Sequence, residues 1–171
     1  MSDLTTLANL AEIFGALVVV GGLAFGVVQL HYYRQQRRET AAIELLRSFH
    51  NPEFSRALRA VLNIPVGVRK KDLGECSADQ ENAIMVVMLT FESIGLMVFR
   101  NIVPLGMVDE LLGGVCVECW GRLNNYIEDS RIENGRDSLS EWFQWLAERL
   151  QEIQALHGCV AAYELHRRWR V

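Results

Sequence analysis

Two pairs of thiol and imidazole side chains have the spacing that metal or redox chemistry uses. Cys116 and Cys119 form a Cys-x-x-Cys pair, and His157 and Cys159 form a His-x-Cys pair later in the chain. Thiolates and imidazole can hold a tetrahedral zinc ion, and a Cys-x-x-Cys pair can also act in redox exchange. In a helix, however, the first pair falls on an apolar stripe with Trp120, where cysteine packs as a small hydrophobic residue. We therefore predict buried structural thiols, with no metal and no other cofactor.

Two carboxylates lie in apolar stretches and are candidates for a functional role. Glu92 has no nearby nucleophile, helix-borne histidine pair or phosphate loop that would complete a catalytic site. We therefore predict that the protein is not an enzyme, and that Glu92 reaches a bundle edge or pairs with Arg100 or Arg122. A ring of Glu12 at the outer mouth of an oligomeric channel would attract cations. The favoured alternative is that Glu12 is an acid at a helix start, stabilised by the macrodipole.

The element that would position Glu12 is a long apolar stretch at residues 10–30, LAEIFGALVVVGGLAFGVVQL. About 20 residues at 1.5 Å rise each cross a hydrocarbon core of about 30 Å. A signal peptide would have a basic leader and a shorter apolar core, whereas the leader here carries only Asp3 as a charged side chain. The sequence therefore predicts an uncleaved transmembrane helix within residues 1–33, with the lipid bilayer as its partner.

Charge asymmetry around this stretch predicts its orientation. Arg34, Arg37 and Arg38 follow the stretch, and no Lys or Arg precedes it. The positive-inside rule then places the amino terminus outside and the remaining domain in the cytoplasm. The three arginines also fit anionic lipid headgroups. The basic runs at residues 69–71 and 167–170 can touch the same surface, although a solvated loop and a frayed terminus are the favoured interpretations.

Small residues lie on one face of the predicted membrane helix. Ala11, Gly15, Gly22 and Gly26 are separated by four, seven and four positions, and the last two form a GxxxG motif. Glycines on one face allow two membrane helices to approach closely, although glycine is also common in membrane helices generally. We therefore predict self-association into a homo-oligomer through these four residues.

The rest of the chain predicts an all-helical cytoplasmic domain. The 171 residues are 50% hydrophobic and 22% charged, and the net charge of −4 gives no reason to expect nucleic acid as a partner. No segment alternates like a strand. We expect an amino-terminal tail and span (1–33), a stalk helix continuous with it (34–50), a bundle of about four to five helices (51–157) and a basic aromatic tail (158–171).

Local signals predict where the helices of the bundle begin and end. Asn51 and Pro52 have the pattern of an N-cap and a first helical residue, which predicts a helix ending near Asn63. A second helix is expected from Ser77 or Ala78 to about residue 100. It is apolar almost all round, so it resembles a short membrane span, but Glu92 in its middle favours a buried bundle helix.

Glycine and serine signals predict the later boundaries. Gly113 and Gly114 are expected to interrupt a helix, so that a short piece precedes them and a longer helix follows to about residue 130. Ser138 and Glu141 have the spacing of a capping box. This motif predicts a last long helix that begins at Ser138 and ends near residue 157.

Two blocks of sequence together resemble a known family. The first is the apolar stretch at residues 10–30, and the second comprises FESIGLMVFRNIVPLGMVDELLGG, CWGRLNNYIEDSR and EWFQWLAERL. They resemble a bacterial family of uncharacterised proteins, a domain of unknown function, over about residues 8–151. The resemblance implies an amino-terminal anchor on a helical cytoplasmic domain and implies no catalytic residues. We predict a membrane-anchored scaffold or docking module for an unknown cytoplasmic protein, with an oligomeric channel as the alternative.

Overall fold

The computed structural model describes residue 15, residues 18–30, residue 32, and residues 51–73, 77–157, 162–165 and 167–170. The chain forms two compact units, residues 1–40 and residues 41–171. The described residues of both units are helical and contain no strand, which confirms the predicted all-helical fold class. The predicted stalk, residues 34–50, lies outside the described residues, so its continuity with the membrane helix stays a prediction.

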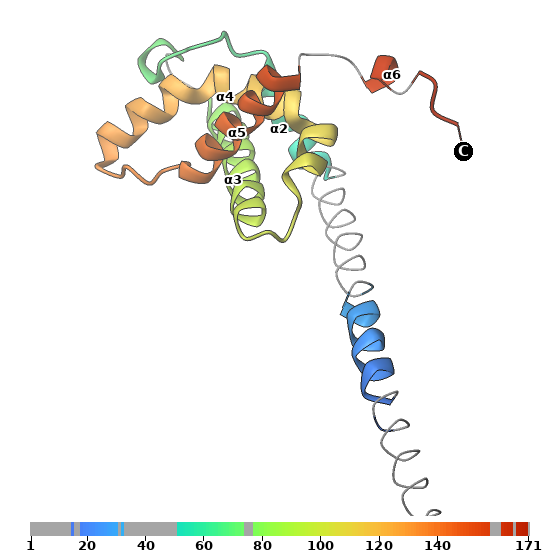
Figure 1. The fold of residues 1–171 in the computed structure, drawn as a ribbon. Coiled ribbons are helices and arrows are strands. Elements are labelled where there is room, and N and C mark those ends of the chain that lie inside the picture. Colours follow the sequence, from blue (N-terminus) through green and yellow to red (C-terminus); the bar gives the residue numbers. More distant parts are fainter. Residues whose placement is uncertain are drawn as a thin grey trace, which may run out of the picture. The chain divides into compact units, whose positions relative to one another are not determined.

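The first unit contains an apolar helix, Val18–Leu30, drawn in blue in Figure 1. Gly15 and Tyr32 are also helical. This helix is the described part of the predicted span, and between its ends the only polar side chain is that of Gln29. The helix therefore forms where its composition predicts.

The second unit begins with α2, Pro52–Leu62, whose start follows the predicted pattern. The Asn51 Oδ1 atom accepts a hydrogen bond from the Glu53 N–H at 2.9 Å, and Pro52 occupies the first helical position. An N-cap side chain satisfies a backbone N–H that has no partner within the helix. The chain then passes through a loop and the 3-10 helix η1, Lys70–Leu73.

Helix α3, Ala78–Phe99, begins at the predicted residue and contacts both α2 and α5 (Figure 1). Ser77 is its N-cap, and the Ser77 Oγ atom accepts a hydrogen bond from the Gln80 N–H at 3.3 Å. Eight of its residues are buried, as expected for a central helix of a bundle. After α3 the chain turns at Asn101, which has a φ of 56°.

Helix α4, Leu105–Asn134, is continuous, so the predicted break at Gly113 and Gly114 is wrong. Gly113 is buried in α4, where a Cβ would lie 2.4 Å from Asp109 Oδ1 and 3.2 Å from Gln154 Nε2. This glycine lets a neighbouring helix approach instead of ending its own. A glycine inside a helix costs only about 1 kcal/mol, which packing along a 30-residue helix outweighs.

Helix α5, Glu141–His157, follows a turn that opens at Gly135, where the backbone is left-handed with φ of 59°. The predicted capping box is wrong, because α5 begins at Glu141 and not after Ser138. The preceding Ser140 has a φ of 56°, which places the reversal of the chain immediately before the helix. A short helix, α6, spans Ala162–Leu165.

Aromatic rings from all four long helices of the second unit meet in its core. Phe91 of α3 stacks on Phe143 of α5 with ring centroids 5.1 Å apart, and Phe54 of α2 meets Phe91 edge-on at 6.1 Å. Trp120 of α4 meets Phe143 edge-on at 5.2 Å. Such pairs each contribute about 0.5–1.5 kcal/mol beyond burial, so these rings fix α3 at the centre of the bundle.

Candidate functional site: three interaction surfaces

The first surface is the apolar helix Val18–Leu30, whose side chains are not covered by the described chain. Its large apolar side chains are between 51% and 69% exposed. A Cβ added at Gly15, Gly22 or Gly26 would meet no atom within 4 Å. This surface is apolar along its whole length, and its glycine face is open.

Several predicted site residues of this first unit lie outside the described residues. They are Ala11, Glu12, Arg34, Arg37 and Arg38. The glycine face is therefore described for three of its four members, and self-association stays a prediction. The role of Glu12 at the outer mouth of a channel and the binding of lipid headgroups by the three arginines also stay predictions.

Helix α3 is long and apolar enough to cross a membrane, and it is the one described helix that satisfies both conditions. Its buried residues, however, face α2 and α5 within the bundle. Val87 and Phe91 are fully enclosed. Length and composition thus suggest membrane association weakly, while the packing is that of a core helix.

The second surface is a side of α3 that the other described elements cover only in part. We call it the α3 seam, and it consists of Met85, Leu89, Glu92, Leu96 and Phe99. The four apolar members are 50%, 58%, 40% and 49% exposed, in chain order. Their separations of four, three, four and three residues are those of the a and d positions of a coiled coil. The seam therefore has the spacing with which one helix packs against another.

Glu92, the polar member of the seam, is used within the bundle. Its Oε2 atom accepts a hydrogen bond from the Phe143 N–H at 2.8 Å. Phe143 lies in the first turn of α5, where backbone N–H groups have no partner in their own helix. Glu92 is therefore a cap supplied by a neighbouring helix, and the predicted pairing with Arg100 or Arg122 is not among its hydrogen bonds or ion pairs in the described residues.

Aromatic side chains and a groove extend the seam at its two ends. The ring of Phe99 lies 4.5 Å from that of Trp142 and 5.9 Å from that of Trp145, centroid to centroid. At the other end, a groove of about 200 Å³ is lined by Met85 and Leu89 on one side and by the turn before α5 on the other. The seam is thus part of a wider half-covered apolar surface.

The third surface is the loop before η1, whose backbone forms hydrogen bonds with residues of α4. Gly67, with a φ of +70°, donates its N–H to the Gly121 carbonyl at 3.0 Å. Its own carbonyl accepts from Asn125 Nδ2 at 2.7 Å, and Arg122 donates to the Ile64 carbonyl. A non-glycine residue rarely adopts that φ, so the glycine sets the path of the loop.

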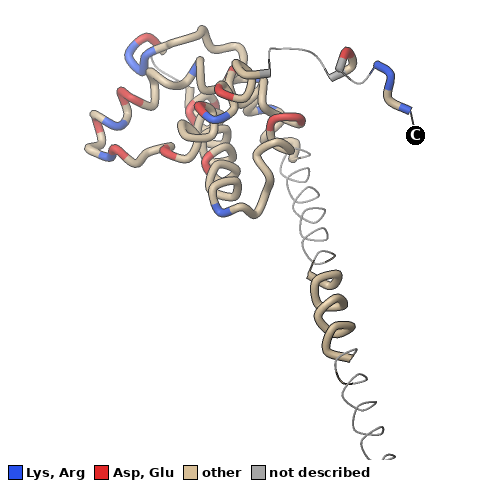
Figure 2. Tube along the Cα trace, in the orientation of Figure 1, with Lys and Arg blue, Asp and Glu red and all other residues tan. Residues whose placement is uncertain are grey.

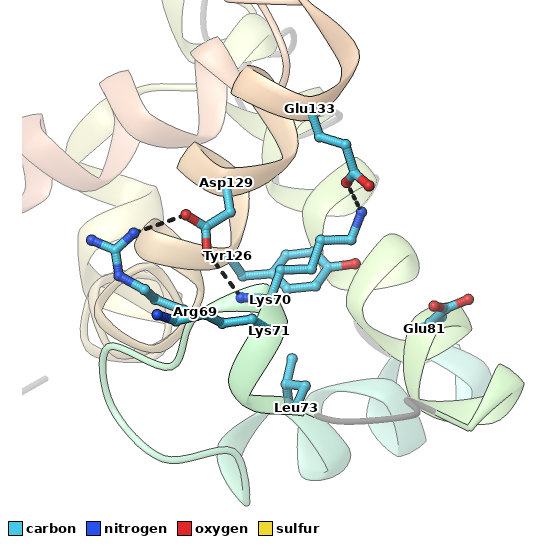
Figure 3. A pocket seen from close by; sticks show the side chains of 8 residues that line it. All are labelled: Arg69, Lys70, Lys71, Leu73, Glu81, Tyr126, Asp129 and Glu133. Carbon is cyan, nitrogen blue, oxygen red and sulfur yellow. Dashed lines mark hydrogen bonds and ion pairs between the residues drawn. The ribbon is translucent and has the colours of Figure 1, made fainter.

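Ion pairs then join η1 to α4 around a pocket of about 470 Å³ (Figure 3). Arg69 Nη1 lies 2.9 Å from Asp129 Oδ1, and the Lys70 N–H donates to Asp129 Oδ2 at 3.1 Å. Lys70 Nζ pairs with Glu133, whose hydrogen bond raises the pKa of Lys70. The basic run at 69–71 is therefore largely offset by acids of the same domain.

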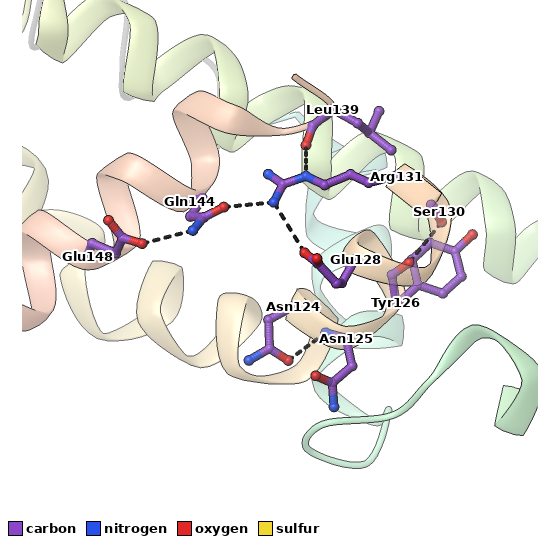
Figure 4. Close-up of polar contacts among 9 residues, drawn as sticks. All are labelled: Asn124, Asn125, Tyr126, Glu128, Ser130, Arg131, Leu139, Gln144 and Glu148. Atoms are coloured by element: carbon purple, nitrogen blue, oxygen red, sulfur yellow. Dashed lines mark hydrogen bonds and ion pairs between the residues drawn. The ribbon is translucent and has the colours of Figure 1, made fainter. Parts of the chain in front are cut away.

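A polar network holds α4, the following turn and α5 together (Figure 4). Arg131 Nε donates to the Leu139 carbonyl at 2.9 Å, and its Nη1 donates to Gln144 Oε1 at 2.8 Å. Gln144 Nε2 in turn donates to Glu148 Oε1 at 2.9 Å. The Arg131 side chain is only 13% exposed, so the network supports the fold and leaves no free ligand group.

The Cys-x-x-Cys pair is buried, which confirms the predicted burial of the two thiols. Cys116 and Cys119 are fully enclosed and share the core stripe of α4 with Leu123. Burial raises the pKa of both thiols, that of Cys119 to about 12. Among the described residues, no group of three or more His, Cys, Asp or Glu side chains is placed to hold a metal ion. Cys159 lies outside the described residues, so the second pair is not tested.

Sequence reasoning missed the α3 seam and the cap from Glu92. A helix that is apolar almost all round does not indicate which side its neighbours will cover. The four-three spacing is present in the sequence, but in so apolar a helix it recurs on several faces and does not single out this one. The Glu92 contact gave no such signal, because its partner lies 51 residues away in the chain.

Comparison with known proteins gives one match. The family model described as a domain of unknown function, DUF4760, matches residues 16–150. The matched range includes the whole apolar helix Val18–Leu30 and the helices from α2 through most of α5. No curated protein and no solved structure matches the chain.

Proposed function

This chain belongs to the DUF4760 family, a domain of unknown function, and we propose that it is a single-pass, self-associating membrane protein whose helical domain is a scaffold in the cytoplasm. One observation carries the proposal: the helix Val18–Leu30 is apolar and wholly exposed. Burying a large apolar side chain is worth about 1.5–3 kcal/mol. A bilayer supplies that burial over the whole surface of one helix.

The orientation follows from the arginines that flank the stretch. With Arg34, Arg37 and Arg38 on the inner side, the domain lies in the cytoplasm and the amino terminus lies outside, in a bacterial inner membrane. The channel alternative has less support, because between Val18 and Leu30 only Gln29 has a polar side chain to line a water path. The role of Glu12, which defines the channel alternative, stays a prediction.

Self-association is supported by features in both units. The open glycine face permits close pairing in lipid, and the α3 seam has the spacing for pairing with a helix. We assign a second copy of α3 as the occupant of the seam, because anchoring in one membrane raises the effective concentration of the copies. Glu92 is the only charged residue between Ala83 and Phe99, and its carboxylate is held by the Phe143 N–H within its own domain.

Anchoring is tested by fractionation of the full chain from cells. We expect the protein in the membrane pellet after alkaline extraction. Replacing Val20 and Leu23 by Lys should release it, since each Lys at mid-span costs about 3 kcal/mol. Leu111→Lys is the matched control, because Leu111 is an exposed leucine of α4. Wild-type protein in the soluble fraction without detergent would refute anchoring, and labelling of the carboxyl end from outside intact cells would refute the orientation.

Self-association is tested by cross-linking in native membranes. We expect dimers or larger species that Gly22→Leu with Gly26→Leu weakens. Leu89→Glu on the seam should also weaken them, whereas Leu111→Glu on α4 should not. A strictly monomeric pattern that none of these variants alters would contradict self-association. If the glycine variants reduce the cross-linked species and Leu89→Glu does not, the pairing is through the membrane helix alone.

A further inference from the structure

The carboxyl-terminal tail presents large amphipathic side chains and positive charge to the solvent. Tyr163 and Trp169 are 75% and 71% exposed. Arg167, Arg168 and Arg170 are also exposed, and Figure 2 shows their basic stretch near the end of the chain. Among the described residues, no carboxylate forms an ion pair with any of these three guanidinium groups. The tail therefore carries charge that the described domain does not offset.

The other basic run of the domain differs in this respect. Arg69 and Lys70 pair with Asp129 and Glu133 of α4 (Figure 3). The two runs look alike in sequence, each with three cations within four residues, but their contacts in the structure differ. A run already paired within its own domain has little charge left for an external anion, whereas no described carboxylate pairs with the arginines at residues 167–170.

The chemistry of the tail fits the headgroup region of an anionic bilayer. Trp and Tyr rings favour the membrane–water interface, and each Arg near an anionic surface strengthens binding about five-fold. Acidic side chains outnumber basic ones in residues 51–157, so the same surface repels the bundle as a whole. The attraction is therefore concentrated in the tail.

We propose that residues 162–170 bind the surface of an anionic phospholipid bilayer, as a second attachment of the domain to the membrane. The inference rests on the proposed anchor, because the anchor brings the tail to the bilayer at high effective concentration. The arginines contact lipid phosphates, and the ring of Trp169 lies at the level of the headgroups. Removing all three arginines should weaken this attachment about 100-fold.

The test uses the full chain reconstituted into bilayers of phosphatidylcholine with or without phosphatidylglycerol, with acyl chains brominated to quench tryptophan emission. The chain has four tryptophans, so the difference between wild type and Trp169→Phe isolates the signal of Trp169. We expect quenching of that signal in the anionic bilayer and little in the neutral one. Replacing Arg167, Arg168 and Arg170 by Gln should abolish the quenching.

The matched control removes the same charge elsewhere. Arg56, Arg59 and Arg100 are exposed arginines outside the tail, and their replacement by Gln should leave the quenching unchanged. Equal quenching in neutral and anionic bilayers would overturn the proposal. Quenching that the tail variant retains, or that the control variant also loses, would overturn it too. Circular dichroism of both variants should match wild type, because all six side chains are exposed.

Failure of the anchor and failure of the tail are distinguishable. If the full chain proves soluble, it is mixed with preformed vesicles of the same two compositions and floated on a density gradient. Flotation with anionic vesicles that depends on the three tail arginines would sustain the tail proposal without the anchor. No flotation would overturn it. Binding to RNA or DNA that exceeds binding to anionic vesicles, and that needs the same arginines, would overturn a lipid as the partner.

Discussion

Replacing Gly95 by Ala tests how closely α3 and α5 cross. This crossing covers one side of α3 and leaves the α3 seam partly exposed. Gly95 is buried where α3 meets the first turn of α5. A Cβ at this position would lie 2.2 Å from the Trp142 carbonyl oxygen and 2.7 Å from its carbonyl carbon. Both are backbone atoms, so no change of rotamer can relieve the overlap. The two helices must separate by about 1 Å to restore ordinary packing distances.

The expected magnitude follows from two opposing effects. Overpacking a well-packed core costs about 1–3 kcal/mol, and the rigid backbone partner places Gly95→Ala at the upper end. Alanine recovers about 1 kcal/mol through its better helix propensity. We therefore expect a net loss of about 2 kcal/mol in the free energy of unfolding, which lowers the melting temperature by about 10 °C for a domain of this size.

Gly114→Ala is the matched control, because it makes the same chemical change in an uncrowded helix. A Cβ at Gly114 would meet no atom within 4 Å, so the variant should gain about 1 kcal/mol. The assay is thermal unfolding of the full chain in mild detergent, followed by far-ultraviolet circular dichroism and by tryptophan emission. If Gly95→Ala stabilises the protein as much as Gly114→Ala does, the close crossing of α3 and α5 is wrong.

Three further variants test contacts within the bundle. Glu92→Gln keeps the acceptor oxygen that caps α5 but removes its charge, so chemical denaturation should show a loss of about 1 kcal/mol; an unchanged midpoint would contradict the cap. Arg131→Lys removes two donated hydrogen bonds and should lower the free energy of unfolding by about 2 kcal/mol. Arg149→Lys, at an exposed ion pair, should lower it by less than about 0.5 kcal/mol. Equal effects of the two variants would contradict the network. Burial raises the pKa of the Cys116 and Cys119 thiols, that of Cys119 from 9.0 to about 12. Unfolding frees these thiols to ionise, so stability should fall as pH rises from about 9, and a Cys116→Ala, Cys119→Ala double variant should lose that part of the pH dependence.

Helix boundaries that depend on neighbours in sequence were predictable. Asn51 and Ser77 cap the helices that follow them, and Gly135 ends α4 in the left-handed conformation. Each of these effects acts within three or four residues, because a cap satisfies backbone groups of one helical turn. Short sequence motifs therefore carry enough information to locate these ends.

Boundaries that depend on tertiary packing were not predictable. Gly113 and Gly114 carry the signal of a break, but α4 runs through both, and Gly113 is buried there beside Gln154 of α5. Ser138 carries the signal of a cap, but the first turn of α5 takes its acceptor from Glu92 on α3. In both cases a contact between helices outweighs a local preference of about 1 kcal/mol.

A candidate surface was predictable where its residues lie close together in the sequence, and was not predictable where they come from distant segments. The apolar helix and its glycines could be read from residues 10–30 directly. The ion pairs of Arg69 and Lys70 could not, because their partners lie about 60 residues away. The two basic runs of the chain therefore look equivalent until the fold offsets one of them with acids of α4.

Hydropathy alone does not separate the two most apolar helices of this chain. Helix α3 is long and apolar enough to be a membrane span, and the described helix Val18–Leu30 lies within the apolar stretch at residues 10–30. Apolar surface must leave water in either case, so the useful question is what covers each helix. The bundle covers α3 on the sides facing α2 and α5, and a second helix is enough to cover the seam. The large apolar side chains of Val18–Leu30 are all exposed, and an apolar solvent such as a bilayer would cover them on every side. Burial, and not hydropathy, is therefore the property that supports the proposed bilayer contact of the amino-terminal helix and protein contacts for α3.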